Sequence, residues 1–122
     1  MIKKKILVLG SEGYLGSILI PSLLKLKNVK LSGIDNCIFG FYNKFKNFSF
    51  IKKDIKKINN KDLDNVSIII DLANISNDPA SELNSKFTKI NNYDYKKKII
   101  NKLKNNSFFE KYIYISSCSV YG

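Results

Sequence analysis

Three glycines lie within Gly10–Gly16, a run that stands between a short apolar stretch and an amphipathic one. Ile6–Leu9 is β-branched and leucine-rich, which is typical of a buried strand. From Leu15 to Leu26 the apolar residues recur at helical spacing, and Pro21 is expected to bend that helix because it removes one backbone donor. A strand, a glycine turn and a helix in this order predict the first unit of an alternating β/α sheet.

Patterns typical of strands and helices continue to alternate along the chain. Val66–Asp71 is almost continuously apolar, which is typical of a strand covered on both faces. Further strands are expected over Val29–Asp35, Phe48–Ile51 and Tyr112–Ser116. We therefore expect an α/β fold, a Rossmann-like, doubly wound parallel sheet of about five strands in the order 3-2-1-4-5, within one domain over residues 1–122.

A long helix is expected before the last strand. Asp78 and Pro79 supply an N-cap and a proline suited to the first helical position. Helical spacing then predicts a helix over 86–104. Its inner face is expected to carry Phe87, Ile90, Ile99 and Leu103. Its solvent face is expected to carry Lys96, Lys97, Lys98 and Lys102.

The three glycines of the first turn predict a site for a pyrophosphate. Gly10 permits the tight turn, Gly13 lets a phosphate approach the backbone, and Gly16 lets the helix pack close to the sheet. The N-terminus of the following helix offers N–H groups and the positive end of its dipole. A glycine-rich turn that binds no ligand is the alternative.

Asp35 is the second candidate binding residue. It lies 19 residues after Gly16, at the expected end of the second strand. A carboxylate there can accept hydrogen bonds from both hydroxyls of an adenosine ribose, and it would repel a 2′-phosphate. The residue therefore predicts a preference for NAD over NADP, although a plain turn aspartate at a strand end is an alternative.

The composition argues against two other classes of function. All 21 basic residues are lysine, and the net charge is +11. Proteins that recognise nucleic acids normally use arginine for bidentate contacts. We therefore interpret the excess of lysine as compositional drift rather than as a sign of nucleic-acid binding. No apolar run is long enough for a membrane span, and two cysteines, Cys37 and Cys118, suit a reducing cytoplasm.

Six short motifs follow one another in the order and spacing of one family. The glycine run has the spacing G-x-x-G-x-x-G, and Ser116–Gly122 is Ser-Ser-Cys-Ser-Val-Tyr-Gly. Between them lie Gly33–Asn36, Lys53–Ile55, Asp71–Asn74 with Ser76–Pro79, and Asn91. With these motifs the chain resembles the N-terminal half of the extended short-chain dehydrogenase/reductase family, the NAD-dependent nucleotide-sugar epimerases and dehydratases. Lys53 departs from the pattern, because the family has glycine there.

The resemblance implies an activity and a set of site residues. It implies NAD as cofactor, a nucleotide sugar as substrate, transient oxidation of a sugar carbon, a homodimeric full-length enzyme and no metal site. Ser117 matches the catalytic serine or threonine, and Ser119 is expected to contact the substrate. The expected cofactor contacts are Gly10, Gly13, Tyr14, Leu15, Gly16, Asp35, Asn36, Asp54, Ile55, Leu72, Ala73, Asn74, Asn91 and Ser116.

The catalytic base that the family implies has no counterpart in the expected place. It is a tyrosine followed four residues later by a lysine, some way beyond the Val-Tyr-Gly motif. Two such pairs, Tyr42 with Lys46 and Tyr93 with Lys97, precede the serine motif, and we interpret them as chance. We therefore expect a truncated cofactor-binding portion that is inactive alone. The alternative is a non-catalytic dinucleotide-binding module that works with a partner chain.

Overall fold

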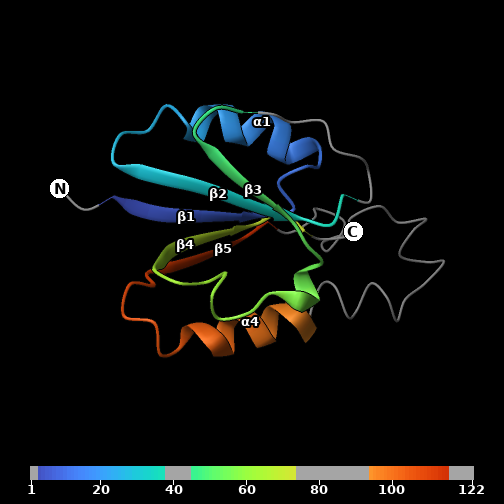
Figure 1. Ribbon diagram of the computed structural model, residues 1–122, viewed down its shortest axis with the longest axis vertical. Helices are drawn as coiled ribbons and strands as arrows, with labels where there is room; N and C mark the ends of the chain where they lie inside the picture. Colours follow the sequence, from blue (N-terminus) through green and yellow to red (C-terminus); the bar gives the residue numbers. More distant parts are fainter. Residues whose placement is uncertain (1–2, 38–44, 74–93, 116–122) are drawn as a thin grey trace, which may run out of the picture.

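The computed structural model describes residues 3–37, 45–73 and 94–115. Five parallel strands form one sheet in the order β3-β2-β1-β4-β5, as predicted (Figure 1). The strands are β1 (Lys4–Leu9), β2 (Val29–Asp35), β3 (Phe48–Lys52), β4 (Val66–Asp71) and β5 (Lys111–Tyr114). The helical elements are α1 (Tyr14–Leu23), the 3₁₀ turn η1 (Ile55–Lys57) and α4 (Tyr95–Leu103).

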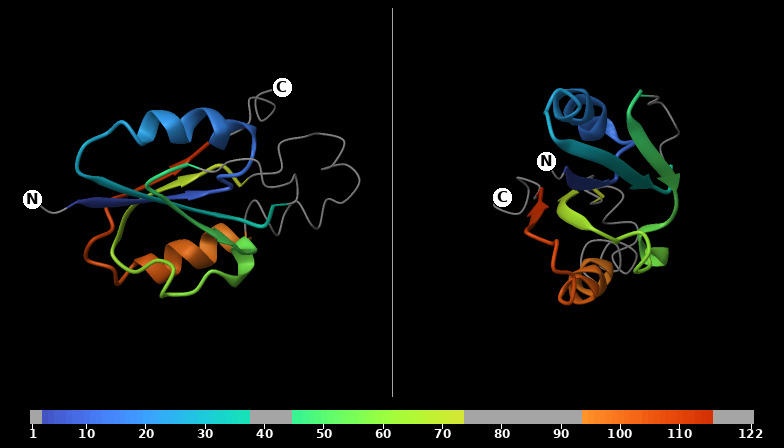
Figure 2. Two further views of the ribbon diagram at one scale, coloured as in Figure 1. Left: turned by 45° about the horizontal axis from the view of Figure 1, so that its top comes forward. Right: turned by 60° about the vertical axis from the view of Figure 1, so that its left-hand side comes forward.

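The sheet has a buried apolar layer on each face. On one face, side chains of β1 and β4 pack with α4 around Leu7, Ile69 and Ile99. On the other face, side chains of β1 and β2 pack against Ile20 of α1. Figure 2 shows the two helices on opposite sides of the sheet. Burial of β1 on both sides from Ile6 to Leu9 explains the unbroken apolar sequence of these four residues.

Helix α1 is shorter than its apolar pattern predicts. It ends at Leu23, whereas the pattern extends to Leu26. Leu26 is 52% exposed, and its N–H donates to the Leu23 carbonyl in a tighter turn, 3.0 Å away. Asn28 then takes a left-handed conformation with φ of 62°. The apolar spacing overshoots because Leu26 continues the pattern without packing against the sheet.

Helix α4 and strand β5 differ from the expected bounds. The described part of the helix runs from Tyr95 to Leu103, while Asp78, Pro79, Phe87 and Ile90 lie outside the described residues. Strand β5 begins at Lys111 and ends at Tyr114, although the Ile115 N–H still donates to the Asp71 carbonyl at 3.3 Å. None of the described helices is long and apolar enough to cross a membrane.

One predicted solvent-facing lysine is buried. Lys97, Lys98 and Lys102 are exposed as expected, but Lys96 is only 5% exposed. Its position follows from helical geometry, because it stands three residues before Ile99 and seven before Leu103, both of which are buried. The prediction for Lys96 is therefore wrong, because it followed the charge of the side chain rather than its position on the helix.

Candidate functional site

The glycine turn lies against the turn that follows β4. Gly10 has a φ of +76°, the left-handed region that favours glycine. A Cβ atom at this position would lie 2.8 Å from the backbone N and Cα atoms of Ala73. The Gly10 N–H donates to the Ile34 carbonyl at 2.8 Å, and the Leu72 N–H donates to the Leu9 carbonyl at 2.8 Å. The ends of three strands therefore meet at Gly10, and no side chain fits between them.

Gly13 has a different environment. It has an extended backbone, with φ of −88° and ψ of −175°. A Cβ atom there would have ordinary contact with the Gly10 carbonyl oxygen, 3.7 Å away, and with no nearer atom outside its chain neighbours. The fold itself therefore tolerates a side chain at this position. The space that a side chain would fill is the space that the sequence analysis assigns to a phosphate.

The first turn of α1 can bind an anion. Gly13 is the N-cap and provides no side-chain hydrogen bond, and the first turn of this described helix holds no acidic residue. The backbone N–H groups at a helix N-terminus have no intrahelical acceptor, and the helix dipole favours negative charge there. Tyr14 and Leu15 are exposed, whereas Gly16 is buried against the Ser11 backbone. A pyrophosphate can therefore reach the predicted residues from solvent.

Asp35 connects the end of β2 with the glycine turn. One carboxylate oxygen, Oδ2, accepts from the Glu12 N–H at 2.9 Å, and Oδ1 accepts from the Cys37 N–H at 2.6 Å. Asp35 and Asn36 are both half-buried. An ionised carboxylate has about four acceptor positions, so two bonds from the backbone leave capacity for ribose hydroxyls. The structure thus places Asp35 beside the predicted phosphate site.

The Cys37 thiol, beside Asp35, has a raised pKa. Burial raises the pKa of Cys37, and the nearby Asp35 carboxylate raises it further. A thiol is reactive as its thiolate, so a raised pKa makes Cys37 less reactive at neutral pH.

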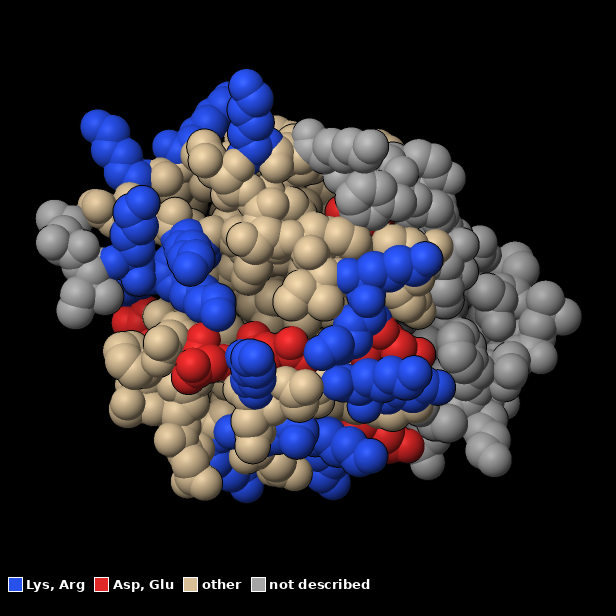
Figure 3. All heavy atoms as spheres, in the orientation of Figure 1, with Lys and Arg blue, Asp and Glu red and all other residues tan. Residues whose placement is uncertain are grey.

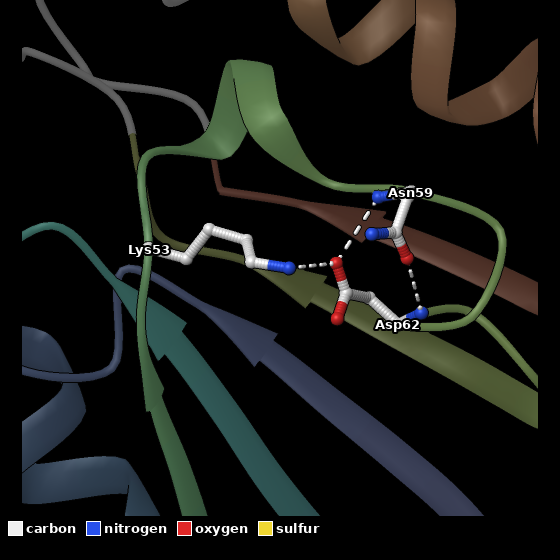
Figure 4. A network of polar contacts seen from close by, with 3 residues as sticks. All are labelled: Lys53, Asn59 and Asp62. Atoms are coloured by element: carbon white, nitrogen blue, oxygen red, sulfur yellow. Dashed lines mark hydrogen bonds and ion pairs between the residues drawn. The ribbon is translucent and has the colours of Figure 1, made fainter.

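The residues after β3 adjoin Asp35 through the backbone. The Lys53 N–H donates to the Asp35 carbonyl at 2.9 Å. The Lys53 side chain, in place of the glycine of the resembled family, forms an ion pair with Asp62 at 2.7 Å (Figure 4). Asp62 also exchanges two hydrogen bonds with Asn59, each 3.0 Å long. The fold accommodates a lysine at position 53 because its side chain is ion-paired with Asp62, in the loop before β4.

Asp54 and Ile55 begin η1. Asp54 caps this turn, because its carboxylate accepts from the Lys56 N–H at 3.0 Å. Its other oxygen lies 3.7 Å from the Lys56 ammonium. The cofactor contact expected of Asp54 stays a prediction, and the structure gives this residue a second role as a cap.

A buried polar cluster, formed by Asp71, Lys96 and Tyr112, lies under the turn after β4. The Asp71 carboxylate is 0% exposed. The Tyr112 hydroxyl donates to its Oδ2 at 2.5 Å, and the Lys96 ammonium lies 3.7 Å from the same oxygen. The other oxygen, Oδ1, accepts from the Ala73 N–H at 3.0 Å. The Lys96 ammonium also lies 3.9 Å from the centre of the Tyr114 ring, which is a cation–π distance.

Burial sets the protonation behaviour of this cluster. It lowers the pKa of Lys96, and the charge of Asp71 opposes that change. Burial and the Asp71 charge both raise the pKa of Tyr112, so its hydroxyl keeps its proton. The cluster was not predicted from the sequence, although the spacing of Lys96 from Ile99 and Leu103 places it on the buried face of α4.

The structure joins only part of the predicted site. It brings the glycine turn, Asp35 and the turn at Leu72 and Ala73 to one edge of the sheet, at the carboxyl ends of β1, β2 and β4 (Figure 1). Five further predicted residues lie outside the described ones: Asn74, Asn91, Ser116, Ser117 and Ser119.

Lysines gather at the end of the sheet opposite the glycine turn, where β1 and β2 begin. A hollow there is lined by lysines at positions 3, 4, 5 and 30, together with Asp64 and Glu110. Lys4 is paired with Glu110 at 3.0 Å. On the face drawn in Figure 3, acidic side chains lie between groups of lysines. The acidic side chains partly neutralise the positive charge of the lysines around them.

Comparison with known proteins identifies relatives over nearly the whole chain. The model of the NAD dependent epimerase/dehydratase family matches residues 6–122. A solved UDP-N-acetylglucosamine 4-epimerase from Methanobrevibacter ruminantium M1, in complex with UDP-N-acetylmuramic acid, is similar at 30% identity with a TM-score of 0.84. That match covers 100% of this chain and 40% of the other.

Two further solved structures are similar. The UDP-glucuronic acid 4-epimerase from Bacillus cereus, in complex with UDP-glucuronic acid and NAD, is 28% identical with a TM-score of 0.83, over 97% of this chain and 41% of the other. The UDP-Glc/GlcNAc 4-epimerase from Campylobacter jejuni is 22% identical with a TM-score of 0.81, over 98% of this chain and 39% of the other, and this likeness concerns the fold alone. The chain thus spans about two fifths of the length of these proteins.

Proposed function

The chain belongs to the NAD-dependent epimerase/dehydratase family, and from this premise we propose that it is the NAD-binding portion of an enzyme that acts on a nucleotide sugar. The observation that carries the proposal is the junction of the glycine turn with Asp35, made by the 2.9 Å bond from the Glu12 N–H. It supports a phosphate site and a ribose site at the spacing of one dinucleotide. The relative from Bacillus cereus, crystallised with NAD and UDP-glucuronic acid, supports the choice of ligands.

The described residues have the chemistry needed to hold NAD. The open space at Gly13 and the first turn of α1 suit the pyrophosphate. The Asp35 carboxylate suits the adenosine ribose, and its charge disfavours the 2′-phosphate of NADP. Leu72 and Ala73, which close the site beside Gly10, would border the cofactor.

The proposed reaction is transient oxidation of a sugar carbon followed by return of the hydride. When bound, NAD supplies the hydride acceptor. The chain's own contribution is to orient the dinucleotide and, through the Ser117 hydroxyl, to hydrogen-bond the sugar oxygen. Such a donor stabilises negative charge that develops on that oxygen. Ser119 is proposed to contact the substrate close by.

Calorimetric titration with NAD and NADP tests the cofactor proposal. We expect tighter binding of NAD, and we expect Asp35→Ala to weaken it by about 1.5–3 kcal/mol, the range for a hydrogen bond to a charged group. Asp64→Ala is the matched control, because Asp64 is an exposed aspartate at the far end of the sheet. Tighter binding of NADP, or equal loss in the two variants, would contradict the proposal.

A further inference from the structure

The buried cluster of Asp71, Lys96 and Tyr112 has no role in the function proposed above. Asp71 is fully buried and Lys96 is 5% exposed, so both charges are removed from water. Such a pair generally stabilises a protein no better than apolar side chains of similar size. Lys96 also shares its helix face with Ile99 and Leu103, where an apolar side chain would pack. The cluster therefore calls for an explanation other than stability.

The Asp71 carboxylate divides its bonds between two parts of the fold. Its Oδ2 faces the core, where it accepts from the Tyr112 hydroxyl at 2.5 Å and lies 3.7 Å from the Lys96 ammonium. Its Oδ1 accepts from the Ala73 N–H at 3.0 Å, within the turn that follows β4. The orientation of the carboxylate, set from β5 and α4, therefore sets the position of the Ala73 backbone.

The Ala73 backbone is in turn part of the candidate NAD site. The space between it and Gly10 is too small for even a Cβ atom, which would lie 2.8 Å from Ala73 N and Cα. A shift of this turn toward Gly10 would displace the glycine turn, and a shift away would open the site. The contacts thus form a continuous path from Lys96 and Tyr112, through Asp71 and Ala73, to Gly10.

We propose that Lys96 and Tyr112 are positioning residues for the dinucleotide site, which act by holding the Asp71 carboxylate in the orientation that fixes the Ala73 backbone against Gly10. The proposal rests on the proposed NAD-binding function. Tyr112 is suited to this role because burial keeps its hydroxyl protonated and therefore a donor. Lys96 is suited because its ammonium balances the carboxylate charge in a place that water does not reach.

Hydrogen exchange at the Ala73 amide tests the first half of this path without any ligand. Tyr112→Phe removes a single oxygen atom, and Lys96→Met removes the charge. Each is expected to speed exchange at Ala73 roughly tenfold, the change produced by losing a hydrogen bond to a charged group. The matched controls, Tyr95→Phe and Lys98→Met on the same helix, are expected to leave it unchanged. Unchanged exchange in a folded Tyr112→Phe chain would overturn the proposal, whether or not Lys96→Met folds.

Calorimetry with NAD tests the second half. Tyr112→Phe and Lys96→Met are expected to weaken NAD binding roughly tenfold, and Lys96→Arg, which keeps the charge, is expected to restore most of it. In an Asp71→Asn background Lys96→Met is expected to have no further effect, because Lys96 acts through Asp71. Additive losses, or no rescue by arginine, would contradict the positioning role.

The two readouts separate this inference from the proposed function. Failure of the unmodified chain to bind NAD would contradict the proposed function, while exchange at Ala73 would still decide whether the cluster holds the turn. Normal NAD affinity together with faster exchange at Ala73 would leave the proposed function in place and overturn the positioning role.

Discussion

Substitution of Gly13 by valine separates ligand binding from folding. Gly13 has an extended backbone, with φ of −88° and ψ of −175°, which a β-branched residue adopts readily. The nearest contact of an added Cβ atom is the Gly10 carbonyl oxygen at 3.7 Å, so the fold needs no adjustment. Replacing an N-cap glycine by an apolar residue costs about 0.5–1 kcal/mol, and the stiffer unfolded chain offsets about 0.4–1 kcal/mol of this. We therefore expect the free energy of unfolding to change by less than about 1 kcal/mol.

The same substitution is expected to abolish NAD binding. The valine side chain would occupy the space in which the pyrophosphate approaches the backbone. Loss of those phosphate contacts, each a charge-assisted hydrogen bond of about 1.5–3 kcal/mol, should weaken binding by at least about a hundredfold. Urea unfolding measures the first quantity and calorimetry the second.

Gly10→Ala is the contrasting variant. Its φ of +76° and its contact with the Ala73 backbone at 2.8 Å predict a loss of stability. The left-handed conformation alone costs an alanine about 1–2 kcal/mol. A folded Gly13→Val chain with unchanged NAD affinity would show that the pyrophosphate does not lie at Gly13. A Gly10→Ala chain as stable as the original would show that the contact of Gly10 with Ala73 does not exclude a side chain.

Three further predictions concern the ion pairs. Lys96→Met should destabilise the fold by about 3–5 kcal/mol in urea unfolding, because it leaves Asp71 buried without its cation, and adding Asp71→Asn should recover most of this loss; equal losses in both variants would show that the pair is not coupled. Folding lowers the pKa of Lys96, so the unfolded chain binds more protons, and stability should rise with pH up to about 10.5; this rise should be absent from Lys96→Met. Folding raises the pKa of Tyr112, so stability should fall above about pH 10, and this fall should be smaller in Tyr112→Phe. Lys53→Ala should cost less than about 1 kcal/mol and leave NAD affinity unchanged, because its partly exposed side chain is bound to Asp62 rather than directed to the site; a large change in affinity would show that Lys53 contacts the cofactor.

The sequence predicts the sheet well because each strand is marked by a local pattern of apolar residues. Val29–Asp35 and Val66–Asp71 match β2 and β4 at both ends, since each run ends at an aspartate whose carboxylate accepts a hydrogen bond from the backbone of the following turn. The glycine spacing and Asp35 are likewise local to the turns that they form. Parallel pairing then brings these turns together, as the bond between Asp35 and the Glu12 N–H confirms.

Other features depend on contacts between distant segments, which spacing does not reveal. The end of α1 depends on whether Leu26 meets the sheet, and it does not. Helical spacing places Lys96 on the buried face, but it does not reveal the carboxylate 25 residues earlier in the chain and the tyrosine 16 residues later that form its polar cluster. A buried lysine is unfavourable unless its charge is paired, and Asp71 provides that pairing for Lys96.

NMR mapping on the ¹⁵N-labelled chain can locate the NAD site residue by residue. We predict saturable shift changes at the amides of the glycine turn, Asp35 and Ala73, which adjoin one another at the carboxyl edge of the sheet. We predict no comparable change around Lys4 and Lys30, in the lysine-lined hollow at the opposite edge. Shifts confined to that hollow, or no saturable shifts at the glycine turn, would contradict the claim that this chain binds NAD where its first strand meets its first helix.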